Sequence, residues 1–190
     1  MEHRKNKKIL FITNAEFGEA QVHLATCHAA VQEDPNVEIH FATYGGIESA
    51  VESASDYSQR CTPHSKPFIF HEIKGITWYA AMKQWYPDRN HLLPASFLEK
   101  GSIWNCLKFT HDMLILFQPW TGTQLAEVFQ SVVRIIEDVN PDLCVVDTLQ
   151  VPGATACHHL GVKWLILSPN CIKEFSGQAN GTKVFWKFPL

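Results

Sequence analysis

The sequence predicts an α/β fold in which a doubly wound, Rossmann-like parallel sheet carries helices on both faces. Two observations support this prediction. Several short runs are apolar at almost every position and rich in β-branched residues, which is typical of strands buried on both faces. Segments with apolar residues at helical spacing separate these runs, so strands and helices alternate along the chain.

The elements follow in order along the chain. We expect strands at residues 8–13, 37–42, 67–73, 143–147 and 163–168. We expect helices at residues 19–33, 107–117, 125–139 and 154–160. The first helix joins the first two strands into a βαβ unit, and such units are right-handed in nearly all cases. The polar stretch at residues 53–66 is expected to be a loop with a short helix, and the tryptophan-rich middle of the chain is less regular.

Length, composition and charge limit the classes of protein to consider. The 190 residues, 46% of them hydrophobic, can form one globular domain over residues 1–190. A net charge of −3 and a single short basic run argue against a nucleic-acid partner. The six cysteines show no C-x-x-C spacing, which fits a reducing compartment, and no run approaches the ~18 apolar residues of a membrane span. We therefore expect a soluble, cytoplasmic protein.

The opening stretch, ILFITNAEFGEAQVHLA, runs from a strand through one glycine, Gly18, into a helix. It lacks the glycines of a dinucleotide-binding loop or a phosphate loop, so no cofactor is expected at this turn. Two acids follow strand ends, Glu19 after the first strand and Asp147 at the end of the fourth. Two acids in one crevice would suit proton transfer. Both residues could instead be ordinary helix-terminus or turn residues.

Three segments carry a resemblance to a known family: ILFITNAEFGEAQVHLATCHAA, PDLCVVDTLQVPGATACHHLGVKWLILSPN and KVFWKFP. They resemble the N-terminal half of the two-domain, GT-B type of UDP-dependent glycosyltransferase, in particular its divergent fungal members. The resemblance implies an acceptor-binding domain and a UDP-sugar as co-substrate. The C-terminal domain that holds the sugar nucleotide in this family is absent from these 190 residues, so we expect the chain alone to be inactive and to bind no cofactor.

The resemblance also implies roles for individual residues. In the family a histidine after the first glycine deprotonates the acceptor hydroxyl, and an aspartate after the fourth strand orients that histidine. Asp147 matches the aspartate, whereas Glu19 stands at the position of the histidine. His23, four residues further along the same helix face, is a substitute base, unless it simply packs against the sheet.

The acceptor itself should contact residues near this turn and in the aromatic-rich middle. We expect Phe17, Gly18, Trp85 and Trp120 to bind a lipophilic small molecule, although such aromatic residues can equally form an ordinary core. The histidines have no spacing that converges on a metal, so no metal site is predicted. Two other functions remain open: a non-catalytic module that binds small molecules, and a flavodoxin-like nucleotide-binding domain.

Overall fold

The computed structural model describes residues 7–86 and 102–169. It contains one five-stranded parallel sheet with strand order β3-β2-β1-β4-β5. The strands are β1 (Lys8–Ile12), β2 (Glu38–Thr43), β3 (Ile69–Glu72), β4 (Leu143–Asp147) and β5 (Trp164–Leu167). The predicted parallel sheet is confirmed, with strand ends within a few residues of those expected. The segment KVFWKFP, at 183–189, lies outside the described residues.

The order of the strands places β1 at the centre of the sheet. β1 pairs with β2 through Ile9 and Ile39, and on its other side with β4 through Phe11 and Val145. The chain first winds outward from β1 to β3 and then returns to add β4 and β5 on the opposite side. The winding therefore reverses between β1 and β4, which is the point where doubly wound sheets bind ligands, beyond the carboxyl ends of the strands.

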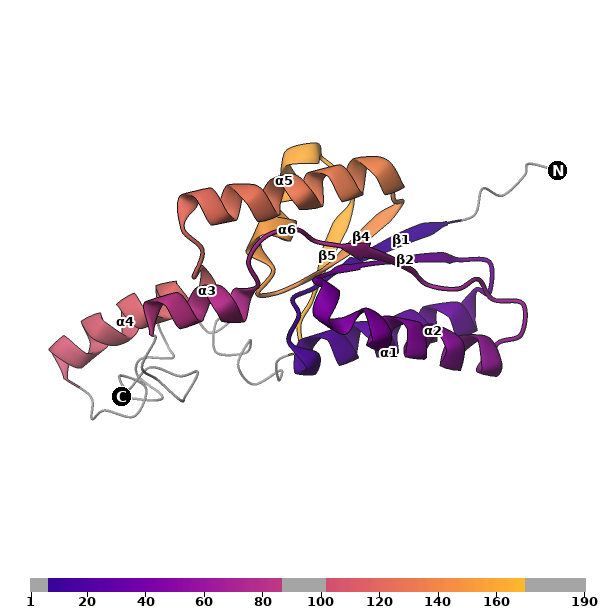
Figure 1. The fold of residues 1–190 in the computed structure, drawn as a ribbon, viewed down its shortest axis with the longest axis horizontal. Coiled ribbons are helices and arrows are strands. Elements are labelled where there is room, and N and C mark those ends of the chain that lie inside the picture. The colour runs from indigo at the N-terminus through magenta and orange to yellow at the C-terminus, as the bar shows by residue number, and fades with distance from the viewer. Residues whose placement is uncertain (1–6, 87–101, 170–190) are drawn as a thin grey trace, which may run out of the picture.

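Helices cover both faces of the sheet (Figure 1). On one face, Phe11 and Phe41 pack with apolar residues of α1 (Phe17–Glu33) and α2 (Glu48–Cys61). On the other face, Ile12 and Val146 pack with residues of α5 (Gly122–Val139) and α6 (Val151–Leu160). Successive strand residues point to opposite faces, so strands that are apolar throughout stabilise both layers, at about 1.5–3 kcal/mol for each large side chain buried.

The helix α2 corrects one expectation: residues 53–66 were expected to be a loop with a short helix, whereas α2 is a 14-residue helix that begins earlier, at Glu48, and ends at Cys61. The buried side of α2 consists of Val51, Ser55 and Ser58, so the side chains that face the core are mostly small and polar. The two serines are stabilised by hydrogen bonds: Ser55 Oγ accepts from the Phe68 N–H at 2.9 Å, and Ser58 Oγ donates to the Ala54 carbonyl at 2.8 Å. Small hydroxyl side chains allow α2 to pack without large apolar residues.

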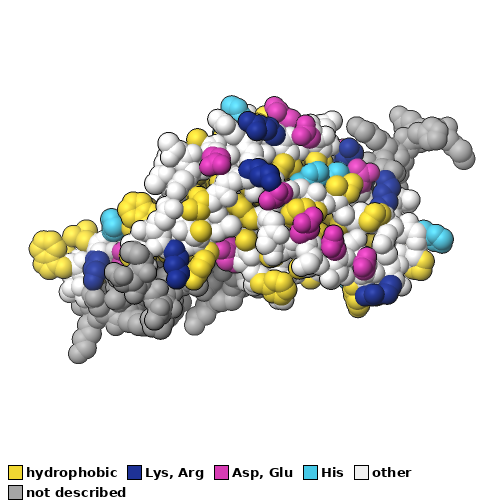
Figure 2. Space-filling model, in the orientation of Figure 1, with side chains coloured by type: hydrophobic (Ala, Val, Ile, Leu, Met, Phe, Trp, Pro, Cys, Tyr) yellow, Lys and Arg dark blue, Asp and Glu magenta, His cyan; other side chains and the backbone are white. Residues whose placement is uncertain are grey.

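The middle of the chain is more helical than expected. The short 3-10 turn η1 (Gly45–Ile47) precedes α2, and α3 (Trp78–Trp85) and α4 (Ile103–Phe117) extend from one end of the sheet (Figure 1). Thr77 and Ser102 cap these helices by accepting hydrogen bonds from backbone N–H groups. Hydrophobic side chains gather over the outer end of this region (Figure 2), where Trp104 of α4 is 79% exposed.

Two further features complete the fold. The sequence Val151-Pro152-Gly153 forms the first turn of α6, where proline is well tolerated. Within residues 7–86 and 102–169, no helix combines the length and the apolarity that crossing a membrane requires. On the face shown in Figure 2, acidic and basic side chains are interspersed.

Candidate functional site

Glu19 and Asp147 meet at the carboxyl ends of two neighbouring strands. Ile12 of β1 pairs with Val146 of β4, so the residues that follow these strands emerge side by side. Asp147 is only 1% exposed, whereas Glu19, in the first turn of α1, is half-buried. His23 Nδ1 lies 3.1 Å from the Glu19 carbonyl oxygen and 3.9 Å from Asp147 Oδ2, so Asp147 lies beside the first turn of α1. After burial, the charge of Asp147 is the next cause of the raised pKa of Glu19. The catalytic roles predicted for them remain predictions.

A third acid, Glu16, belongs to the same group and was not singled out from the sequence. Glu16 precedes α1, yet its side chain does not cap that helix. One carboxylate oxygen, Oε1, accepts a hydrogen bond from the backbone N–H of Tyr79 in α3 at 3.2 Å, and the other is buried without a partner. We refer to Glu16, Glu19 and Asp147 together as the acid cluster. The sequence places acids at the N-cap and in the first turn of α1, Glu16 and Glu19, but only Glu19 stands at a position that the family resemblance marks.

The acid cluster holds its protons unusually tightly. Burial, followed by repulsion from Asp147 and Glu16, raises the pKa of Glu19 to about 8, against an opposing hydrogen bond from Asn14 Nδ2 at 3.3 Å. Burial also raises the pKa of Asp147 to about 6, although the Leu149 N–H donates to its Oδ1 at 2.7 Å. Desolvation therefore outweighs the helix dipole, which would stabilise an ionised Glu19. A carboxylate with a pKa near neutrality can accept a proton and release it again.

His23 lies beneath the acid cluster, between α1 and the sheet, and is 0% exposed. Its Nδ1 is 3.1 Å from the Glu19 carbonyl oxygen, which can only accept, so Nδ1 carries a hydrogen. The same nitrogen is 3.9 Å from Asp147 Oδ2, and burial lowers the pKa of the ring. The ring also packs edge-on against Phe11. A buried, neutral His23 can position its neighbours, but in this arrangement it is shielded from a bound molecule.

The residues expected to bind the acceptor separate into two groups. Phe17 is 55% exposed at the start of α1, and the position of a Cβ at Gly18 has open space around it. Trp85 is half exposed at the end of α3. Trp120 is only 4% exposed and belongs to the hydrophobic core, with its indole N–H donating to a backbone carbonyl. In this conformation Phe17, Gly18 and Trp85 can contact a ligand, whereas Trp120 is enclosed.

Other polar residues near the strand ends were not anticipated. Tyr44 follows β2 and is 4% exposed, and Gln150 follows β4 and is 0% exposed. The amide of Gln150 is close enough to the Tyr44 hydroxyl to affect the pKa of Tyr44. Behind them α6 packs so closely against the sheet that a Cβ added at Gly153 would lie only 3.0 Å from Ile12 Cγ2. Nothing in the local sequence distinguishes these residues from ordinary loop residues.

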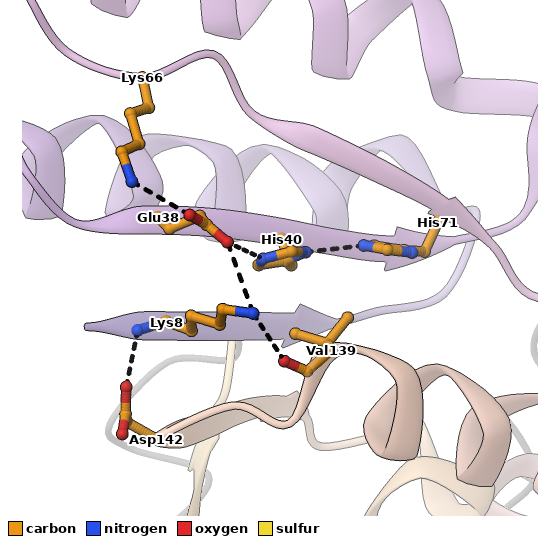
Figure 3. Close-up of polar contacts among 7 residues, drawn as sticks. All are labelled: Lys8, Glu38, His40, Lys66, His71, Val139 and Asp142. Atoms are coloured by element: carbon orange, nitrogen blue, oxygen red, sulfur yellow. Dashed lines mark hydrogen bonds and ion pairs between the residues drawn. The ribbon is translucent and has the colours of Figure 1, made fainter. Parts of the chain in front are cut away.

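A second cluster of polar side chains runs across the strands on the α5 side of the sheet (Figure 3). His40 Nε2 is 3.0 Å from Glu38 Oε1 and His40 Nδ1 is 2.8 Å from His71 Nε2, while Lys66 and Lys8 lie 3.1 and 3.8 Å from the Glu38 carboxylate. These contacts join β1, β2 and the chain around β3, so their role is structural. Within the described residues, no three His, Cys, Asp or Glu side chains are arranged to hold a metal ion.

The fold and the acid cluster can now be compared with known proteins. No protein-family model matches the chain. The curated protein "Glycosyltransferase sdnJ" from Sordaria araneosa is 24% identical over 192 residues, which cover 98% of this chain and 37% of that protein. The structure of the glycosyltransferase SnogD from Streptomyces nogalater has a TM-score of 0.51 and 19% identity, covering 87% of this chain and 35% of that one. SsfS6 from Streptomyces sp. SF2575, complexed with thymidine diphosphate, has a TM-score of 0.54 and 14% identity, covering 86% and 38%.

These comparisons confirm the resemblance that the sequence showed. The chain has the Rossmann-like fold found in part of the GT-B glycosyltransferases. It spans about a third of the length of these relatives, so it is similar to a fragment of them.

Proposed function

We propose that this chain is the acceptor-binding half of a glycosyltransferase that transfers a hexose from a UDP-sugar to a hydroxyl of a lipophilic small molecule. The observation that carries the proposal is the meeting of Glu19 and Asp147 at the switch point between β1 and β4, in a fold similar to that of glycosyltransferases. The sugar nucleotide would be bound by a second domain, for which the full-length relatives have room. The chain alone should therefore not transfer sugar.

In the proposed reaction, the acceptor hydroxyl loses its proton to Glu19 as its oxygen attacks the anomeric carbon of the sugar. The bond from that carbon to the diphosphate breaks, and the nucleoside diphosphate leaves. Glu19 must be ionised to accept the proton, and its pKa of about 8 makes it a stronger base than an ordinary glutamate. Burial is the main cause of this raised pKa, and the negative charge of Asp147, which is fixed by the Leu149 N–H, raises it further.

The test joins this chain to the donor-binding part of a full-length relative and measures transfer from UDP-glucose, and from a thymidine diphosphate sugar, to a panel of lipophilic alcohols. Activity in the joined protein, lowered ~10²-fold or more by Glu19→Gln or Asp147→Asn, is the expected result. If the joined protein is active only as Glu19→His, Glu19 does not serve as the base. Ligand binding without transfer in any form would instead favour the non-catalytic binding module.

A further inference from the structure

Buried polar atoms without a hydrogen-bond partner gather at one place in the described structure. Apart from Ser65 Oγ, all of them belong to residues at, or packed against, the carboxyl ends of β1, β2 and β4. An unsatisfied buried polar group costs about 1–3 kcal/mol, so folded proteins rarely collect them without a purpose. A group of such atoms at the switch point of a doubly wound sheet indicates a site that is completed by a ligand.

The unpartnered atoms are mainly hydrogen-bond acceptors. Asn14 Oδ1, Glu16 Oε2, Asp147 Oδ2 and Gln150 Oε1 accept. His23 Nε2 also accepts, because its Nδ1 carries the hydrogen, but His23 is enclosed beneath α1 and is not among the atoms that a ligand would contact. Gln150 Nε2 is the one obligatory donor among them, and it lies beside the Tyr44 hydroxyl, so these two atoms can partly satisfy each other. The remaining atoms are hydroxyls, which can act in either way. A ligand complementary to this set must supply several N–H or O–H groups.

The contacts show that these atoms share one neighbourhood. Asn14, which is 0% exposed, donates from Nδ2 to Glu19 Oε2, so its free Oδ1 lies beside the acid cluster. Gln150 lies against the Tyr44 hydroxyl, and the charge of Glu16 reaches that same hydroxyl. The Asn14 amide is thus bonded to the acid cluster, and Gln150 lies next to it, because its backbone N–H donates to the Asp147 carbonyl at 3.1 Å.

Charge distinguishes among the possible donors. In the described part of the chain, no lysine or arginine forms an ion pair with Glu16, Glu19 or Asp147; the nearby basic side chain of Lys83 stands over the Tyr79 ring, 5.7 Å from its centroid. Once the carboxylates are ionised, toward pH 8, a neutral alcohol would leave their negative charge uncompensated, whereas a protonated amine offers up to three donors and a positive charge. Phosphate-bearing groups would be repelled.

We infer that the acid cluster binds a protonated amine carried by the acceptor molecule, with the exposed rings of Phe17 and Tyr79 available to its apolar part. This rests on the proposed function only in assigning the amine to an acceptor. Phe17 is next to Glu16 in the chain and 55% exposed, and Tyr79, whose N–H binds Glu16, is 43% exposed. The amine anchors the molecule, and a separate hydroxyl receives the sugar.

The raised pKa values of Glu19 and Asp147 predict that amine binding depends on pH. In the free protein near neutral pH the acid cluster retains protons, and an ammonium group would displace them. Amine binding should therefore release protons and strengthen from pH 6 to pH 8, whereas the binding of an alcohol should change little. His23, neutral and hydrogen-bonded to the Glu19 carbonyl, faces Asp147 and stays uncharged over this range because burial lowers its pKa.

The experiment titrates the 190-residue chain, without sugar nucleotide, with 3-phenylpropylamine and with 3-phenylpropan-1-ol, and follows backbone amide signals by NMR. At pH 8 we expect the amine to bind at least about tenfold more tightly than the alcohol, because it adds charge-assisted hydrogen bonds. The chemical-shift changes should centre on residues 14–19 and 147–150. Equal affinity of the two probes, binding of neither, or shifts centred elsewhere would overturn the inference.

Two variants locate the effect. Glu16→Gln keeps an acceptor for the Tyr79 N–H but removes one charge, so the preference for the amine should fall about fivefold or more; Glu19→Gln serves if that protein does not fold. Glu52→Gln, on the exposed side of α2, should leave the preference unchanged. If alcohols bind and are glycosylated by the joined protein without any preference for the amine, this inference fails and the proposed function stands. If the amine is preferred but the joined protein transfers no sugar to any acceptor, this inference stands and the proposed function fails.

Discussion

Replacing Glu19 by glutamine should stabilise the folded chain at pH 8 and change little at pH 5. The pKa of Glu19 rises from 4.5 to about 8 on folding, because burial and the charges of Asp147 and Glu16 disfavour its ionised form. The folded state thus keeps a proton that the unfolded state releases, and stability falls as the pH rises from about 4.5 to about 8. Glutamine stays neutral throughout and can still accept the hydrogen bond from Asn14.

The size of the effect follows from the pKa. A tenfold change in proton affinity corresponds to about 1.4 kcal/mol, so the full rise would amount to about 5 kcal/mol. Glu19 is only half-buried, and solvent screens its charge, so we expect a gain of about 1–2 kcal/mol at pH 8. For a chain of this length, that gain raises the melting temperature by about 3–6 °C.

Thermal unfolding followed by circular dichroism at pH 5, 6.5 and 8 measures this difference. Glu52→Gln, which neutralises an exposed acid of α2, is the matched control and should shift the melting temperature little at any of these pH values. A Glu19→Gln protein that melts at or below the wild-type temperature at pH 8 would refute the reasoning, since it would show that the ionised carboxylate is not destabilised by its surroundings.

Two more predictions concern the scaffold. Burial lowers the pKa of His40 and of His71, so the unfolded chain binds more protons below about pH 6.5 and the folded chain loses stability as the pH falls. His71→Gln should reduce this loss, measured as the urea midpoint of unfolding from pH 7 to pH 5. An unchanged loss of stability would contradict the prediction. Gly75→Ala should lower the free energy of unfolding by about 2–3 kcal/mol, because φ is 116° there and the added Cβ would lie 2.7 Å from Val128 Cγ2. Gly18→Ala, where the space is open, is the control, and an unaltered melting temperature of Gly75→Ala would rule the prediction out.

Local patterns were sufficient for much of the scaffold. The apolar runs around Ile9 and Val145 predicted buried parallel strands, because a strand covered on both faces must be apolar at nearly every position. The same reasoning failed for α2, whose buried side is formed by Val51, Ser55 and Ser58. Ser55 packs there by accepting a hydrogen bond from Phe68, which lies outside the helix, and a pattern of apolar residues cannot register such a contact.

The candidate site divides in the same way. The sequence by itself placed Glu19 and Asp147 after strand ends, since the end of an apolar run marks the residues that leave the sheet. Only the tertiary structure decided that β1 and β4 are neighbours, that Glu16 binds the Tyr79 backbone 63 positions further along the chain, and that His23 is enclosed. Strand order and burial arise from long-range packing, and these, through desolvation and charge repulsion, raise the pKa of Glu19.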